Sequence, residues 1–155
     1  MDTKTPFRRC INCFAPQEES GACFHCGYEN GLGDLPGWWL VPGTVLKGRY
    51  ITGCSRNSGS SELRYLGWDL QMEHPVEIME FFPRGSVTRD ITYADEVVTV
   101  PGHEEEVERG RQAFFEKAKL FYQCAGRVEP DLQMDFFLRN NTCYYTLRRG
   151  TGTRE

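Results

Sequence analysis

The sequence predicts an α+β protein, in which a small cysteine-rich module precedes a domain of five antiparallel strands and one long helix. Four of the 7 cysteines fall within the first 26 residues, in a segment with almost no aliphatic side chains. Residues 104–124 show the apolar periodicity of an amphipathic helix. Short apolar segments bounded by turn residues lie on both sides of that helix, which is typical of strands.

Length and composition limit the classes of function. The chain has 155 residues, 39% hydrophobic and 13% aromatic, which suffices for one domain plus a small module and excludes wholesale disorder. Its net charge is −4, whereas proteins that bind duplex nucleic acid through phosphates are usually basic. No apolar run reaches the roughly 18–20 residues that span a bilayer, and no signal-peptide pattern opens the chain. We therefore expect a cytoplasmic protein with no membrane partner, whose cysteines are thiols or metal ligands.

The boundary between the two modules is expected near residue 36. Residues 1–30 cannot build an apolar core, and residues 31–37 form a linker rich in glycine and proline. Trp38 and Trp39 follow directly and should anchor the linker on the second module. We therefore assign residues 1–36 to the cysteine module with its linker, and residues 37–155 to the α+β domain.

Three strands are expected before the helix. Residues 49–54 and 62–70 flank a turn rich in serine, glycine and asparagine, and residues 75–82 form the third strand. Residues 83–102 contain several prolines and glycines and are the least readable part of the chain, although residues 96–100 fit a short strand.

The helix and the final hairpin carry the clearest local signals. Residues 104–124 place their apolar side chains on one stripe, and the three glutamates at 104–106 complement the helix dipole in the first turn. Residues 132–138 and 142–149 form a hairpin across a turn at residues 139–141. The predicted order is therefore three strands, one helix and two strands.

The N-terminal cysteines form two C-x-x-C pairs, which are Cys10 with Cys13 and Cys23 with Cys26. Each pair places two thiolates on one side of a tight turn, and two facing turns give the tetrahedral sulfur site that Zn²⁺ prefers. A redox dithiol needs one such pair, not two, and an iron site with the same ligands is the remaining alternative. Four protein ligands leave no open position, so the predicted zinc is structural and supplies folding free energy to a module without a core.

Five segments carry a resemblance to a known family, and they are Pro42–Tyr50, Tyr65–Leu70, His74–Gly85, Phe114–Lys119 and Asp135–Tyr145. Together they resemble the N-terminal lobe of bacterial serine/threonine protein kinases, most closely those in which a zinc ribbon precedes the kinase domain. The resemblance implies a five-stranded antiparallel sheet with one long helix, in the order already read from the residues.

The positions that serve catalysis in that family are changed in this chain. Of the three glycines of the phosphate-binding loop only Gly59 is kept, and Glu62 takes the place of the third. Met79 replaces the phosphate-binding lysine, Glu77 replaces the small residue over the adenine, and Lys117 replaces the helix glutamate that pairs with the lysine. The chain contains no H-R-D or D-F-G word, which belong to the C-terminal lobe. The resemblance therefore implies a pseudokinase-like module that is not an enzyme and binds no ATP.

The expected function is non-catalytic binding of another protein, so that the module regulates or inhibits a partner protein or nucleoprotein complex. The expected contact surface is the sheet face that a second lobe shields in a kinase, together with the helix edge and the C-terminal arginines. Its residues are Glu77, Met79, Lys117, Leu147, Arg148 and Arg149. Self-association through this face is one alternative, and another is that the linker tryptophans cover it. A nucleic-acid-binding zinc ribbon and one half of a split nucleotide-binding kinase are the alternative functions.

Overall fold

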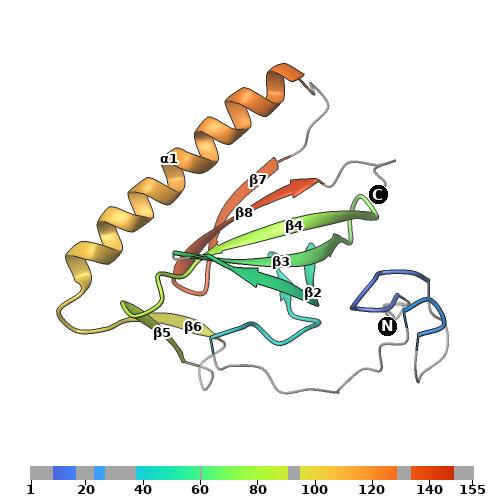
Figure 1. Ribbon diagram of the computed structural model, residues 1–155, viewed down its shortest axis with the longest axis horizontal. Helices are drawn as coiled ribbons and strands as arrows, with labels where there is room; N and C mark the ends of the chain where they lie inside the picture. The colour runs from blue at the N-terminus through green and yellow to red at the C-terminus, as the bar shows by residue number, and fades with distance from the viewer. Residues whose placement is uncertain are drawn as a thin grey trace.

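The computed structural model describes residues 9–16, 23–26, 38–59, 61–90, 95–128 and 134–148. Within these residues the chain forms a curled antiparallel sheet, a separate two-stranded ribbon and one helix (Figure 1). The expected domain boundary near residue 36 and the expected contact residue Arg149 lie outside the described residues.

The main sheet has six strands in the order β1-β2-β3-β4-β8-β7, and every neighbouring pair is antiparallel. These strands are β1 (Val45–Leu46), β2 (Tyr50–Ser58), β3 (Glu62–Asp69), β4 (His74–Phe81), β7 (Met134–Arg139) and β8 (Thr142–Arg148). The ribbon and the helix are β5 (Val87–Asp90), β6 (Glu96–Thr99) and α1 (Glu104–Val128). The helix and the five longer strands of the sheet therefore lie where the sequence predicts them, with ends that differ by a few residues.

The expectation of five strands is wrong by one, because β1 adds a sixth at the edge of the sheet. Val45 pairs with Ile51 and Leu46 with Tyr50 across a turn in which Lys47 and Gly48 both have positive φ, at 59° and 65°. A strand of two residues is too short to show a periodicity in the sequence. Strand β5, with four residues, was also not predicted, because it is nearly as short.

The sheet curls until its two ends meet through side chains. Tyr50 of β2 stacks on Phe137 of β7 with ring centroids 5.7 Å apart, and its hydroxyl donates a hydrogen bond of 2.9 Å to Asp135. Lys47 forms an ion pair of 2.7 Å with the same carboxylate. The inner face of the curl is filled by fully buried side chains such as Tyr65 and Tyr144. We call this the inner face, and the opposite one the α1 face.

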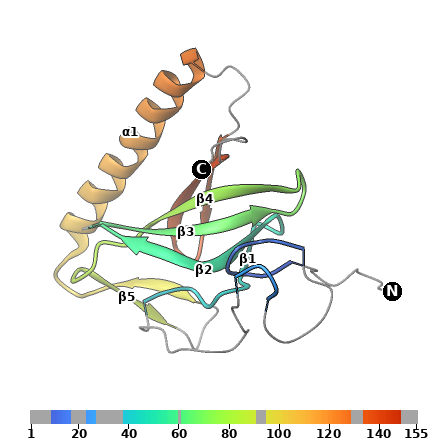
Figure 2. The same ribbon diagram turned by 45° about the vertical axis from the view of Figure 1, so that its right-hand side comes forward.

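Helix α1 packs on the α1 face, along β7 and β8, and starts beside the β5–β6 ribbon (Figures 1 and 2). Phe114 of α1 contacts Phe81 and Tyr145, with centroids 5.5 and 5.2 Å away. Met79 lies opposite Tyr145 in the β4–β8 register, belongs to the same buried cluster as Phe114 and is only 2% exposed, so the apolar patch expected at this position is not on the surface.

The linker tryptophans contact the second module, as expected, and they do so away from the α1 face. Trp39 packs edge-on against Tyr65 of the inner face, with centroids 5.6 Å apart. Trp38 lies near the ribbon, where its carbonyl accepts a hydrogen bond of 2.8 Å from Arg89. The alternative in which these residues cover the kinase-type contact face is therefore wrong. Within the described part of the chain, α1 is too polar to cross a membrane, and no other helix is present there.

Candidate metal centre and the α1 face

The first cysteine pair lies in a closed turn. The backbone N–H of Cys10 donates to the carbonyl of Ala15, and the backbone N–H of Phe14 donates to the carbonyl of Cys10. Arg9 and Pro16 form an isolated antiparallel β-bridge. Phe14 has a positive φ of 63°, which lets the chain reverse within so few residues. The turn therefore holds Cys10 and Cys13 on the same side.

The two cysteine pairs share the same hydrogen-bond pattern. The backbone N–H two residues after the first cysteine donates to its sulfur, from Asn12 to Cys10 and from His25 to Cys23, both at 3.3 Å. The side chain of Asn12 also reaches the Cys26 sulfur at 3.4 Å. Such N–H···S bonds orient thiolate ligands and offset their negative charge. His25 is exposed and takes part through its backbone N–H.

The four sulfur atoms have the spacing of a metal-ligand set. All four lie within 4.8 Å of one another, with 3.7 Å between Cys10 and Cys26 and 3.8 Å between Cys13 and Cys23. A regular tetrahedron with Zn–S bonds near 2.3 Å has sulfur–sulfur edges of about 3.8 Å. The cysteines therefore lie close enough to bind a metal ion, and their chemistry and spacing fit structural zinc.

Ionisation of the free thiols differs across the cluster. Burial raises the pKa of Cys13 to about 12, helped by the neighbouring cysteine thiols. Hydrogen bonds from the backbone N–H groups of Cys26 and His25 lower the pKa of Cys23. Because a metal binds thiolates, its binding must displace protons from this cluster, most of all from Cys13.

The first cysteine turn docks on the α1 face of the sheet, at the end away from α1 (Figure 1). Phe14 is buried against Ile51, Trp68 and Leu66, and the guanidinium of Arg9 lies 4.1 Å from the Trp68 ring centroid. The carbonyl of Ile11 accepts a hydrogen bond of 2.8 Å from the backbone of Cys54.

Gly53 permits this approach. A Cβ at Gly53 would lie 2.5 Å from the Ile11 carbonyl oxygen and 2.8 Å from the Phe14 ring, which no side chain tolerates. The cysteine turn and the sheet are therefore in direct contact, through both backbone and side chains.

Residues that the resemblance assigns to changed kinase positions come together near the α1 face. Lys117 of α1 forms an ion pair of 3.2 Å with Glu62 at the start of β3. Glu62 pairs with Phe81 and Arg64 with Met79 in the β3–β4 register. Burial, with the carboxylates of Glu62 and Glu77 adding to it, raises the pKa of Tyr145 to about 12.

The other expected contact residues have mixed exposure. Glu77 and Leu147 face each other across β4 and β8 and are half-buried, and Arg148 is half-buried at the end of β8. Lys117 is exposed. Binding of a partner by these residues stays a prediction. Met79 is buried, so a partner cannot reach it.

The inner face contains a buried ionic network that the sequence analysis missed. Glu80 and Arg89 form an ion pair of 2.6 Å in which neither side chain is more than 1% exposed. The hydroxyls of Tyr65 and Tyr144 donate to the two oxygens of Glu80, and burial raises the pKa of both tyrosines. Arg89 also donates to the carbonyls of Trp38 and Asp95. The available signal was Glu80, the second of two glutamates inside the mostly apolar segment Val76–Phe82.

Comparison with solved structures places this fold beside a bacterial kinase fragment described as "PpkA-294 apo form". The two chains superpose with a TM-score of 0.62 at 18% sequence identity, over 72% of this chain and 38% of the fragment. At this identity the likeness shows the fold alone, and the chain matches well under half of the fragment's length. No protein-family model and no curated protein matches the chain.

Proposed function

We propose that this chain is a non-catalytic protein-binding module, built from a zinc ribbon and a pseudokinase-like N-lobe, that regulates or inhibits a partner protein. The observation that carries the proposal is the ion pair between Lys117 and Glu62. By the resemblance, Lys117 occupies the place of the helix glutamate, and Glu62 that of a glycine that lets backbone approach phosphate. The pair thus puts a carboxylate where a nucleotide would need positive charge or bare backbone.

Met79 supports the same conclusion. It stands where the kinase lysine pairs with phosphates, and it is packed beneath α1 with no charge to offer. Exposed Arg64 lies opposite it in the register, and the charges of Arg64, Glu62 and Glu77 all act on Tyr145, the partner of Met79 in β8. The arrangement therefore favours a face that is buried by packing within the protein over a face that binds phosphate.

The zinc ribbon fills the other end of the same face. Phe14 packs against Leu66, which lies directly opposite Glu77 in the β3–β4 register. By the resemblance, Glu77 stands in the place of the small residue that covers the adenine. The docked turn and the carboxylate therefore occupy space that an adenine ring requires in a kinase.

We assign the proposed partner surface to the second half of α1. Phe114 and Phe121 are seven residues apart and share one side of the helix, yet Phe114 is 5% exposed and Phe121 is 44% exposed. The sheet therefore covers this side at Phe114 and leaves it open at Phe121. Tyr122 and Leu120 are also exposed. Exposed aromatic side chains on a rigid helix are typical of protein contacts.

Two measurements test the proposal. In the first, Mg-ATP should produce no shift in melting temperature and no heat of binding with the wild-type chain. The M79K variant should behave in the same way, because Glu62 and Glu77 remain. Saturable Mg-ATP binding by the wild-type chain would contradict the non-catalytic assignment.

The second measurement is capture of partners from the native cell by the wild-type chain and by F121D. The control is V98D, which changes a residue of similar exposure (41%) on β6. A specific protein partner should be retained by the wild-type chain and V98D and lost by F121D. Equal capture by all three would place the contact away from α1.

A further inference from the structure

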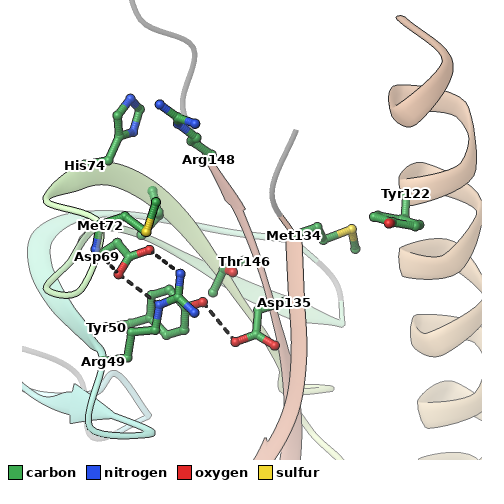
Figure 3. Close-up of a pocket in the computed structure, with 11 residues that line it drawn as sticks. Arg49, Tyr50, Asp69, Met72, His74, Tyr122, Met134, Asp135, Thr146 and Arg148 are labelled. Carbon is green, nitrogen blue, oxygen red and sulfur yellow. Dashed lines mark hydrogen bonds and ion pairs between the residues drawn. The ribbon is translucent and has the colours of Figure 1, made fainter. Parts of the chain in front are cut away.

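A cavity of about 260 Å³ opens at one end of the curled sheet (Figure 3). The register explains its lining, because Asp69 pairs with His74, Val76 with Arg148 and Asp135 with Thr146. These residues all belong to the inner face, at the end where the apolar core stops. The cavity is therefore the polar mouth of the curl, lined by ionisable side chains from strands that are distant in sequence.

Most of the charges at this mouth are already paired. Arg49 donates two hydrogen bonds to Asp69, at 2.9 and 2.8 Å, which is the bidentate geometry of a strong pair. Asp69 also accepts from the backbone of Gln71 and Met72. Asp135 accepts from Lys47 and Tyr50. Both carboxylates are therefore satisfied, and their negative charge is offset within the protein.

Two groups at the mouth remain without partners among the described residues. His74 is 9% exposed, and its buried Nε2 makes no hydrogen bond. Its Nδ1 lies 2.9 Å from the carbonyl of Pro75, which only accepts, so Nδ1 carries the proton and Nε2 is free to accept. Arg148 is half-buried and makes no ion pair within the described chain, and its side chain extends toward His74 in Figure 3.

We propose that this cavity binds a small phosphate group, as the free ion or as the phosphate of a small monoester, between Arg148 and Nε2 of His74. A guanidinium matches the oxygens of phosphate in a bidentate manner. A phosphate group that carries a proton has a P–OH that donates to the free Nε2, while its other oxygens accept from the guanidinium of Arg148. A bound phosphate group thus provides a hydrogen-bond partner for Nε2 of His74 and a counter-ion for Arg148.

The size of the cavity fits a ligand of this kind. Sites for drug-sized molecules have volumes of roughly 300–1,000 Å³, so this cavity suits a smaller ligand. Arg49 and Lys47 neutralise Asp69 and Asp135, which leaves Arg148 as the uncompensated charge and favours an anion. Most of this site lies on the inner face, and Tyr122 of α1, which also belongs to the proposed partner surface, lines the cavity as well.

The test is titration of the full chain with inorganic phosphate and with glycerol 3-phosphate, by calorimetry and by NMR, at constant ionic strength. The variants are R148Q and H74Q, and the control is R64Q, which removes an exposed arginine from the opposite face of the sheet. Wild type and R64Q should bind with equal affinity. R148Q should bind at least about tenfold more weakly, because a charge-assisted pair is lost. H74Q should also weaken binding, and if it fails to fold, R148Q decides alone.

Sulfate distinguishes phosphate recognition from general anion attraction, because it has the same shape but no proton to donate near neutral pH. It should bind several-fold more weakly than phosphate, and equal binding would overturn the assignment to phosphate. Absence of saturable binding of either phosphate compound at millimolar concentration would overturn the proposal. So would unchanged affinity in R148Q. Tighter binding of glycerol 3-phosphate than of phosphate would identify a monoester as the ligand, and the reverse would identify the free ion.

Discussion

Phe14 of the first cysteine turn stacks on Trp68 of β3, with ring centroids 5.8 Å apart and ring planes 25° from parallel. This contact joins a segment without a core of its own to the sheet. Phe14 is buried here, whereas Phe24 in the second cysteine turn is 96% exposed. The cysteine cluster is therefore coupled to the sheet through one turn only, among the residues described, and this asymmetry leads to the first two predictions.

One equivalent of zinc should bind to the chain through the four clustered cysteines. Replacement of Cys23 by serine should reduce the zinc content, measured by elemental analysis, to a small fraction of one equivalent. The melting temperature of the whole chain should also fall, because the cysteine turn that packs on Trp68 loses its metal. The matched control is C54S, which should retain zinc. Full zinc content in C23S would contradict the assigned ligand set.

Replacement of Phe14 by alanine should destabilise the chain by about 3 kcal/mol, as is typical when a buried phenylalanine is lost. The measurement is the free energy of unfolding in urea, with zinc content followed in parallel. F24A is the matched control, because its side chain is exposed and the change should stay within about 0.5 kcal/mol. If F14A and F24A have the same small effect, the contact with Trp68 does not contribute to stability.

Replacement of Glu80 by glutamine should destabilise the fold by about 3–5 kcal/mol, because Arg89 would keep a buried charge without a counter-ion. The double variant E80M/R89M should be more stable than E80Q, since it removes both charges. E77Q is the control, as it changes a half-buried glutamate on the other face of the same strand. Urea denaturation of the four proteins gives the comparison, and a mild effect of E80Q would show that the network tolerates a neutral partner.

Stability should decrease in acid because of Asp69 and Asp135. Burial alone would raise the pKa of each carboxyl, but hydrogen bonds from Arg49 and two backbone N–H groups lower that of Asp69, and Lys47 and Tyr50 lower that of Asp135. A carboxyl with a lower pKa in the folded state stabilises the fold fully above its ordinary value of 3.8. That contribution is lost as the pH falls through the lowered folded value.

The measurement is the unfolding free energy from about pH 6 down to about pH 2, for the wild-type chain and D69N. The wild type should lose stability more steeply than D69N in the acid range. E105Q, at an exposed position of α1, should follow the wild type. Parallel curves for all three proteins would mean that the Arg49–Asp69 pair contributes nothing to acid sensitivity.

The local patterns of the sequence were sufficient for the cysteine cluster, the helix and most strands. The C-x-x-C spacing brings each pair of sulfurs together within one turn, so it predicts the metal site without knowledge of the rest. The periodicity of residues 104–124 predicts α1, and the paired asparagines 140 and 141 take up positive φ in the β7–β8 turn. Each of these signals depends on residues only a few positions apart.

Tertiary structure alone decided how these elements face one another. The hydrogen bond from Tyr50 to Asp135 spans 85 residues of sequence and closes the curl, and with it the mouth where His74 and Arg148 lie. The burial of Met79 beneath α1 and the docking of Phe14 on Trp68 likewise join distant segments. Periodicity identifies the apolar face of a helix or strand, but it does not identify the element against which that face packs. The partners of Glu80, Met79 and Phe14 therefore follow from packing of the complete chain.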